Sequence, residues 1–364
     1  MHRMRRTLAL AAFLAVGVAA PVSAKTIRFN HLQTVGSHNS YHLEVSPREK
    51  ELRAPVTGVQ ESSLEYAFPP LGVQFAQQNV RQIELDLLPD DTGGRFVAPA
   101  VRIAAGLGPL QDPAMYRPGV KVLHIQDADY VTTCPTFVAC LSTVKAQSDR
   151  APGHAPFTFL LELKDDPIGN PATWTPTRIA AAEAEIASIF PRNRILTPDD
   201  VRGSRATLNE AVTTTGWPSI DRARGKVLFL LDNDPGSGAG LSYRALHPGA
   251  RGGLVFPNST PGTPEAAFVK RNDAKKSQAE IRRLVRTGYV VRTRADADTR
   301  EARANDTSTR DAALASGAQW VSTDYPAPGY ADRFQSPYFV SIGKPARCNP
   351  IVAPRGCRDA VFGR

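Results

Sequence analysis

Short apolar runs recur along this chain, and polar residues follow each of them. The runs are five to nine residues long and contain β-branched positions. Runs of this length, bounded by polar residues, predict β-strands. Eight strands are predicted, at residues 32–38, 80–88, 120–126, 157–164, 226–234, 253–257, 289–295 and 318–324.

Helical patterns separate several of the predicted strands, at residues 176–190, 278–288 and 307–318. The last two end on a glycine suited to a helix C-cap. Eight strands alternating with helices predict an α/β fold, a (β/α)8 TIM-type barrel. An open doubly wound sheet is the alternative, but no Gly-x-Gly-x-x-Gly follows the first strand. No linker divides the chain, so residues 25–364 are expected to form one catalytic domain with loop insertions.

Charged side chains interrupt two of the most apolar strands. In "IELDLL" (83–88), acidic and aliphatic residues alternate, so Glu84 and Asp86 share one face. In "LLELK" (160–164), Glu162 and Lys164 share a face in the same way. The aliphatic side chains can pack beneath the barrel helices, which directs the charged side chains into the barrel.

Bare carboxylates inside a barrel carry a large desolvation cost and therefore need a partner. One reading is an internal salt bridge from Lys164 to Glu162 or Asp86. The other reading is a metal cation. Three carboxylates and an amide oxygen are hard oxygen donors, which suit Ca²⁺ or Mg²⁺ better than zinc.

Two histidines stand at comparable places in the predicted barrel. The stretch "TVGSHNSYH" (34–42) ends the first strand in a turn that contains His38 and Asn39. His124 lies late in the predicted third strand, near the C-terminal mouth where barrels keep their chemistry. A lone histidine on such a strand is usually a core residue. Two imidazoles facing each other over a cation, however, suit phosphodiester cleavage, because one takes a proton and the other gives one.

These residues resemble a known family. "GSHNSYH" is similar to the Ser-His-Asn-[Ser/Thr]-Tyr signature that opens the catalytic barrel of phosphoinositide-specific phospholipase C, and "IELD", a strand-borne histidine and "LELK" follow in that family's order. The resemblance is closest to the exported bacterial, calcium-dependent branch, which "CPTFVACLSTV" after the second histidine also resembles. It extends from residue 32 to about 326.

The resemblance implies a role for each matching residue. His38 and His124 would be the catalytic pair, and Lys164 would contact the substrate phosphate. One calcium ion would be held by four residues, namely Asn39, Glu84, Asp86 and Glu162. In that family an inositol hydroxyl attacks phosphorus and releases diacylglycerol and an inositol phosphate, cyclic or opened. His124 would be the general acid, and His38 would stabilise or deprotonate at the phosphoryl group.

Some features of that family have no clear counterpart in this chain. The regulatory modules of the eukaryotic enzymes are absent. The residues that grip the inositol hydroxyls are not evident, and we select Arg292, Arg294 and Asp232 as candidates. Ordinary salt bridging at the rim is the competing reading of those three. The remaining histidines are expected on the surface or in loops, at positions 31, 42, 154 and 247.

The two ends of the chain and its cysteines indicate export. Residues 1–24 carry three arginines, then an apolar run, then small residues ending at Ala24, which is typical of a cleaved signal peptide. The protein is therefore expected to be secreted or periplasmic. Of three possible connectivities, the short spacings favour Cys134–Cys140 and Cys348–Cys357, the second of which would staple the C-terminal tail.

The formal charge is +9, or +6 without the three leader arginines. A basic exported protein is attracted to anionic membrane surfaces, so a phospholipid bound peripherally by a monomer is the expected partner. No nucleic-acid motif and no later transmembrane segment is evident.

Three other functions are possible. They are a glycerophosphodiester phosphodiesterase of the same barrel, a non-catalytic calcium-dependent module that binds anionic lipid, and a DNase I-type nuclease. The first opens on His-Arg-Gly, whereas Asn39 follows His38 here. The second has little use for two imidazoles at the mouth. The third has a two-sheet sandwich fold, which alternating strands and helices do not favour.

Overall fold

Eight parallel strands form a nearly closed barrel in the computed structural model, which describes residues 26–165 and 173–363. The predicted signal peptide lies outside the described residues. Neighbouring barrel strands follow the order β6-β5-β4-β2-β1-β9-β8-β7, and a parallel bridge between Asn258 and Phe268 joins the two ends. The barrel strands are β1 (Leu32–Ser37), β2 (Gln82–Leu88), β4 (Phe157–Leu163), β5 (Val227–Leu231), β6 (Val255–Pro257), β7 (Phe268–Asp273), β8 (Val290–Arg294) and β9 (Trp320–Thr323).

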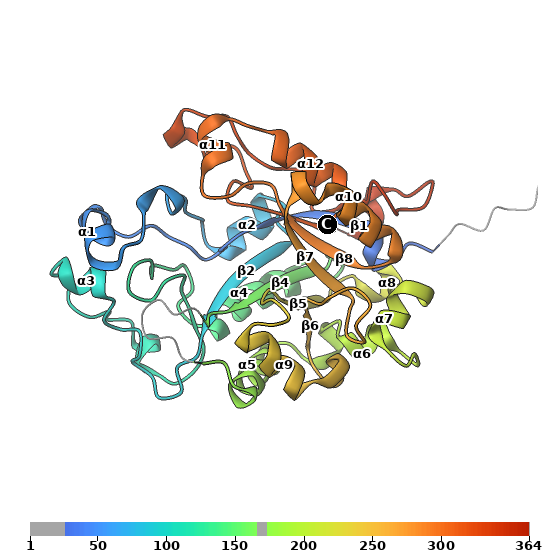
Figure 1. Cartoon of the computed structure of the whole chain (residues 1–364), viewed down its shortest axis with the longest axis horizontal. Helices are drawn as coiled ribbons and strands as arrows, with labels where there is room; N and C mark the ends of the chain where they lie inside the picture. The colour runs from blue at the N-terminus through green and yellow to red at the C-terminus, as the bar shows by residue number, and fades with distance from the viewer. Residues whose placement is uncertain (1–25, 166–172, 364) are drawn as a thin grey trace, which may run out of the picture.

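Helices surround this barrel (Figure 1). The three predicted helices are present as α5 (Pro176–Ile189), α10 (Ala274–Thr287) and α12 (Ser308–Ser316), and left-handed glycines follow the last two as predicted. The other helices are α1 (Pro47–Thr57), α2 (Leu71–Gln77), α3 (Ala100–Ala104), α4 (Phe137–Arg150), α6 (Pro198–Arg202), α7 (Leu208–Glu210), α8 (Ile220–Ala223), α9 (Gly238–Leu246) and α11 (Arg300–Ala304). No helix in the described ranges has the length and apolar character to cross a bilayer.

The barrel prediction is confirmed, but one of the eight predicted strands was wrong. Residues 120–126 contain only the two-residue strand β3 (Lys121–Val122), which pairs antiparallel with the end of β2 and is not part of the barrel. The apolar side chains of this segment wrongly indicated a barrel strand, because Val122 and Leu123 are buried in two separate clusters. They therefore do not mark a strand with one packed face.

The remaining barrel strand is β7, which was not predicted from the sequence. Its sequence "FVKRND" is apolar only in its first two residues. The ammonium group of Lys270 lies 2.7 Å from the carboxylate of Asp232. Arg271 instead forms an ion pair with Glu280 on α10. Charge pairing near the barrel mouth thus removes the apolar signal on which strand prediction depends.

The two ends of the barrel interior differ in polarity. At the N-terminal end, Trp320 is buried against Phe29 and Phe268 and donates a hydrogen bond to Thr158 (3.1 Å). Toward the C-terminal end, strand residues carry the charged side chains. The aliphatic residues of β2 point outward into the main core, as predicted for Ile83, Leu85 and Leu87.

The loops that leave the C-terminal ends of β1 and β2 build a separate lobe, residues 44–57 and 96–131, which we call the mouth lobe. It contains α1 and α3, which lie side by side away from the barrel helices (Figure 1). A small core of its own holds it together, including Val45, Phe96, Val101, Met115, Leu123 and Tyr130.

Both predicted disulfides are present. One disulfide joins Cys134, which precedes α4, to Cys140 within that helix. The other, Cys348–Cys357, closes a loop in the C-terminal tail. The tail returns to the barrel through β10 (Arg347–Cys348), which pairs antiparallel with β1. The four cysteines of the chain are thereby used in disulfides, so none is free to bind a metal ion.

Candidate active site

The turn after β1 places two adjacent side chains at the barrel mouth. β1 ends at Ser37, and Asn39 adopts a left-handed conformation (φ 45°), which asparagine tolerates better than most residues. The His38 amide still donates to Thr323 at the end of β9, so the histidine stays anchored to the barrel. The amide of His42 closes the turn on the Asn39 carbonyl (2.8 Å).

Three carboxylates from two neighbouring strands meet beside this turn. Glu84 and Asp86 on β2 lie next to Glu162 on β4, and one oxygen from each lies within 4.8 Å of the others. Register explains the meeting, because Asp86 pairs directly with Glu162. Burial raises the pKa of Glu84 to about 7, against the opposing effect of Arg292. Burial and the neighbouring Glu162 also raise the pKa of Asp86 well above its ordinary value.

The donor set at this cluster fits a hard cation. Both oxygens of Asp86 are buried without a hydrogen-bond partner among the described residues, and so is Oδ1 of Asn39. Asn39 donates its Nδ2 to the hydroxyl of Tyr66 (2.9 Å), which leaves the amide oxygen available. Buried polar atoms are rarely left unpaired, so these acceptors fit a calcium ion.

The internal salt bridges considered from sequence are also present. Lys164 lies 3.1 Å from a Glu162 oxygen and 3.4 Å from Asp86. Arg292, which is 1% exposed, pairs with Glu84 at 2.5 Å. Lys164 approaches one Asp86 oxygen as an ion pair, and the other oxygen has no hydrogen-bond partner among the described residues. Salt bridging therefore accounts for part of this buried charge, and buried acceptor oxygens remain that a cation can use.

His38 is held by groups from β8 and β9. Its Nδ1 lies 2.7 Å from Asp324, and its Nε2 lies 3.1 Å from the guanidinium of Arg294. Arg294 also pairs with Asp324 at 3.1 Å. Burial, reinforced by Arg294, Arg292 and the nearby His124, lowers the pKa of His38 well below its usual value. A neutral ring with hydrogen on Nδ1 and a lone pair on Nε2 satisfies all of these contacts.

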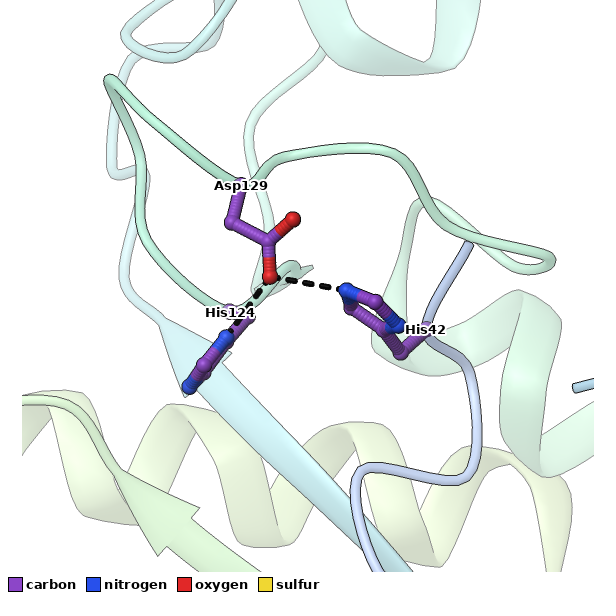
Figure 2. Close-up of side chains that lie close together, drawn as sticks. All are labelled: His42, His124 and Asp129. Carbon is purple, nitrogen blue, oxygen red and sulfur yellow. Dashed lines mark hydrogen bonds and ion pairs between the residues drawn. The ribbon is translucent and has the colours of Figure 1, made fainter. Parts of the chain in front are cut away.

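His124 is held in a similar way by a different carboxylate. Its Nδ1 lies 2.8 Å from Oδ2 of Asp129, and the same oxygen lies 2.8 Å from Nε2 of His42 (Figure 2). Burial alone would raise the pKa of Asp129, but His42 and His124 hold it below its ordinary value. His124 is carried by the loop after β3, which corrects the expected strand position. Its side chain remains 19% exposed, so the ring reaches the surface of the mouth.

Two of the histidines expected on the surface or in loops lie in loops but are buried. His42 is completely buried beside Asp129, and His154 is buried against Phe157 with the ring centroids 3.9 Å apart. His42 is bonded to Asp129, 87 residues away, whereas His154 is bonded to Ser148 and to the Ala155 carbonyl, so no apolar pattern in the local sequence reveals either burial.

The remaining predicted substrate contact also lies at the mouth. Asp232 follows β5 and accepts from Lys270, and it is close enough to Glu84 to raise the pKa of that carboxyl. Ion pairs thus engage Arg292, Arg294 and Asp232, which agrees with the competing reading of these residues. Their contact with substrate stays a prediction.

Sequence reasoning missed the two carboxylates that orient the histidines. Asp324 is the last residue of the predicted strand 318–324. Its position at a strand end was the signal that could have placed it at the barrel mouth. Asp129 lies five residues after His124 in the tight turn bridged by Ile125 and Asp129. Because position 124 was assigned to a strand, a return of the chain onto the histidine was not considered.

Comparisons with known proteins identify the family of this chain. A family model described as phosphoinositide phospholipase C, Ca²⁺-dependent, matches residues 27–350. A calcium-dependent phosphoinositol-specific phospholipase C from Pseudomonas sp. has a similar structure, with TM-score 0.55 and 17% identity over 89% of this chain and 96% of that chain. A calcium-dependent phosphatidylinositol-specific enzyme from Streptomyces antibioticus has TM-score 0.52 and 18% identity over 82% of this chain and 95% of its own.

No curated protein sequence matches the chain. The two structural similarities support the barrel fold, and the family match spans most of the sequence. The resemblance carried by "GSHNSYH", "IELD" and "LELK" is therefore confirmed: this chain belongs to the calcium-dependent phosphoinositide phospholipase C family, whose members are phosphoric diester hydrolases.

Proposed function

We propose that this chain cleaves the glycerol–phosphate bond of phosphatidylinositol-type lipids and releases diacylglycerol and an inositol phosphate. One observation carries the proposal at the level of residues. Two imidazoles, each bonded through Nδ1 to a buried carboxylate, stand beside three clustered carboxylates at one barrel mouth. Acid–base catalysis and cation binding are thereby combined within one site.

Asn39, Glu84, Asp86 and Glu162 are the proposed ligands of one calcium ion. When bound, the ion would offset negative charge on the phosphoryl oxygens. Lys164 pairs with Glu162 and Asp86 in the structure, and it is the proposed contact for the substrate phosphate. A lysine at this place binds phosphate as a mobile point charge.

The two histidines are proposed to divide the proton transfers between them. Nε2 of His38 would exchange its hydrogen bond from Arg294 for one from the inositol hydroxyl, and would accept that proton as the hydroxyl oxygen attacks phosphorus. Asp324 would stabilise the imidazolium that forms, because it accepts the hydrogen bond from Nδ1 of His38. His124 would donate its Nε2 proton to the departing diacylglycerol oxygen, and Asp129 would hold that ring in the matching orientation. Arg294 contacts both His38 and Asp324, which keeps this pair aligned.

The inositol ring would be held by groups across the mouth from His124. Arg292 and Asp232 are the proposed hydroxyl contacts, and Lys270 shares a hydrogen bond with Asp232. Inositol offers both donors and acceptors, so paired charged groups can each exchange a hydrogen bond with it.

Peripheral binding to a membrane is a further part of the proposal. Large apolar side chains are exposed on the mouth lobe, with exposed fractions of 41% for Val56, 46% for Ile103, 46% for Leu107 and 48% for Tyr116. The same lobe carries His124 and Asp129. Burying these side chains in the bilayer surface would bring the catalytic acid to the lipid headgroups. We also propose that the protein is exported and acts as a monomer.

The proposed ligands predict calcium binding that weakens in acid. Glu84 must be ionised to bind, and its pKa is about 7 before binding. Protons therefore compete with calcium as pH falls through 7, and affinity should be about tenfold lower at pH 6 than at pH 8. Glu84→Gln should weaken binding and flatten this dependence, measured by titration calorimetry at both pH values.

Glu51→Gln is the matched control, because Glu51 is exposed on α1, where it pairs with Arg48. It should bind calcium like the wild type. Equal affinity at pH 6 and pH 8 in the wild type, or unchanged affinity in Glu84→Gln, would contradict the ligand assignment. Chelation should abolish activity, and added Ca²⁺ should restore it where Zn²⁺ does so poorly.

The two proposed catalytic histidines predict a separable loss of turnover. His38→Ala and His124→Ala should each lower kcat by about 10²- to 10⁴-fold, because a proton acceptor or donor is removed. The denaturation midpoint should stay close to that of the wild type. His247→Ala is the control, since His247 contacts Glu183 away from the mouth. A fully active His124→Ala protein would rule out the mechanism.

The mouth lobe predicts a loss that depends on the physical state of the substrate. Ile103→Ser combined with Leu107→Ser should reduce activity on phosphatidylinositol vesicles at least tenfold, because apolar burial at the bilayer surface is lost. Activity on a monomeric short-chain substrate should be unchanged.

Leu241→Ser is the matched control, because Leu241 is 57% exposed on α9, outside the lobe. It should keep vesicle activity. If the double variant and the control behaved alike in vesicle sedimentation and activity, this surface would not be the docking face.

A further inference from the structure

His42 shares one carboxylate oxygen with the proposed catalytic acid. Nε2 of His42 and Nδ1 of His124 both lie 2.8 Å from Oδ2 of Asp129, and the two ring centroids are 6.2 Å apart with the rings nearly perpendicular. Figure 2 shows the two imidazoles approaching that oxygen from different sides. A carboxylate oxygen accepts two hydrogen bonds, so both imidazoles draw on the same negative charge.

The protonation of His42 is determined by its surroundings. Its side chain is completely buried, and Nδ1 has no hydrogen-bond partner among the described residues. A proton on Nδ1 would be a buried donor without an acceptor, which is unfavourable. Nε2 of His42 therefore carries the hydrogen that is directed at Asp129.

The position of the His42 ring is also tightly constrained. The ring packs on Tyr66 with centroids 4.4 Å apart, and the His42 carbonyl accepts from the amide of Phe68 (3.0 Å). His42 also forms a backbone bridge with Thr132, in the same loop as Asp129. This ring is thus a rigid donor that joins the turn after β1 to the His124 loop.

We propose that His42 is a positioning residue for His124, acting through Asp129. The proposal rests on the proposed function, in which His124 is the general acid. By holding Oδ2 in place, His42 fixes the direction of the Nδ1–H bond of His124 and so aims its Nε2 into the mouth. By sharing that oxygen, it also reduces the charge available to His124, which makes the imidazolium a stronger acid.

Other charged groups also face His124. Arg53 on α1 is completely buried, with Nη2 3.4 Å from Oδ1 of Asp129, so it acts on the oxygen that His42 leaves unused. Across the mouth, His38 and Asp324 interact electrostatically with His124. These groups are unchanged in the variants below, so a shift on altering His42 reports the shared oxygen.

The experiment compares His42→Phe with His42→Gln in the calcium-loaded protein. Phenylalanine keeps the packing on Tyr66 but cannot donate, whereas the glutamine amide can reach Asp129 and donate as Nε2 does. His42→Phe should lower kcat about tenfold with little change in KM. The basic limb of its kcat–pH profile should move upward by about half a unit or more, because His124 regains charge from Asp129. His42→Gln should restore kcat to within about threefold and return the limb.

A readout independent of turnover is the pKa of His124 from NMR titration of labelled histidine side chains. It should rise in His42→Phe and return in His42→Gln. An unchanged pKa and pH limb in a folded His42→Phe protein would overturn the proposal, as would equal losses in both variants. A stoichiometric metal ion in the purified wild type that is lost in His42→Phe would also overturn it, since the three side chains would then be metal ligands.

The His124→Ala variant separates this proposal from the one on which it rests. If His124→Ala is fully active, the proposed general acid is wrong whatever His42 does. If His124→Ala is inactive and His42→Phe behaves like the wild type in both readouts, only the positioning role fails.

Discussion

The cost of burying charge governs the arrangement of this barrel mouth. Glu84 and Asp86 project from β2, whose other face is packed beneath helices, so these two carboxylates cannot turn toward solvent without disrupting the core. Burial raises the pKa of Glu84 to about 7. Arg292 and Lys164 pair with the carboxylates in place of water. Such a cluster gains most from a compact divalent cation. Because the apolar outer faces of β2 and β4 pack beneath helices, the carboxylates lie on the inner faces, where a cation stabilises them.

The same constraint orders the two histidines. Each is fixed through Nδ1 by a carboxylate that is at most 1% exposed, Asp324 for His38 and Asp129 for His124. The carboxylates are held by cations in turn, through Arg294 in one case and Arg53 in the other. The pairs come from opposite parts of the architecture. His38 and Asp324 end adjacent barrel strands, whereas His124 and Asp129 belong to the mouth lobe, so the proposed membrane-binding surface and the proposed general acid are parts of one unit.

The sequence predicted those parts of the fold that depend on regular periodicity. Alternation in "IELDLL" correctly separated Glu84 and Asp86 from the outward leucines, because a strand residue's direction follows from its parity. The same reasoning failed at residues 120–126, where apolar side chains serve the core of a lobe, and at β7, where charge pairing replaces apolar residues. Asp129, Asp324 and the buried His42 escaped because their importance lies in contacts between distant segments. The family signature compensated in part, since it identified His124 although its predicted strand does not exist.

The most direct test of the central claim is a phosphodiester panel analysed by ³¹P NMR, with the wild-type protein in Ca²⁺ or in chelator. The substrates are phosphatidylinositol, its phosphorylated and glycosylated forms, phosphatidylcholine and glycerophosphocholine. We predict that inositol lipids alone are cleaved, only with Ca²⁺, and that diacylglycerol and an inositol phosphate appear together. Cleavage of glycerophosphocholine or phosphatidylcholine, or undiminished cleavage of phosphatidylinositol in chelator, would contradict the account.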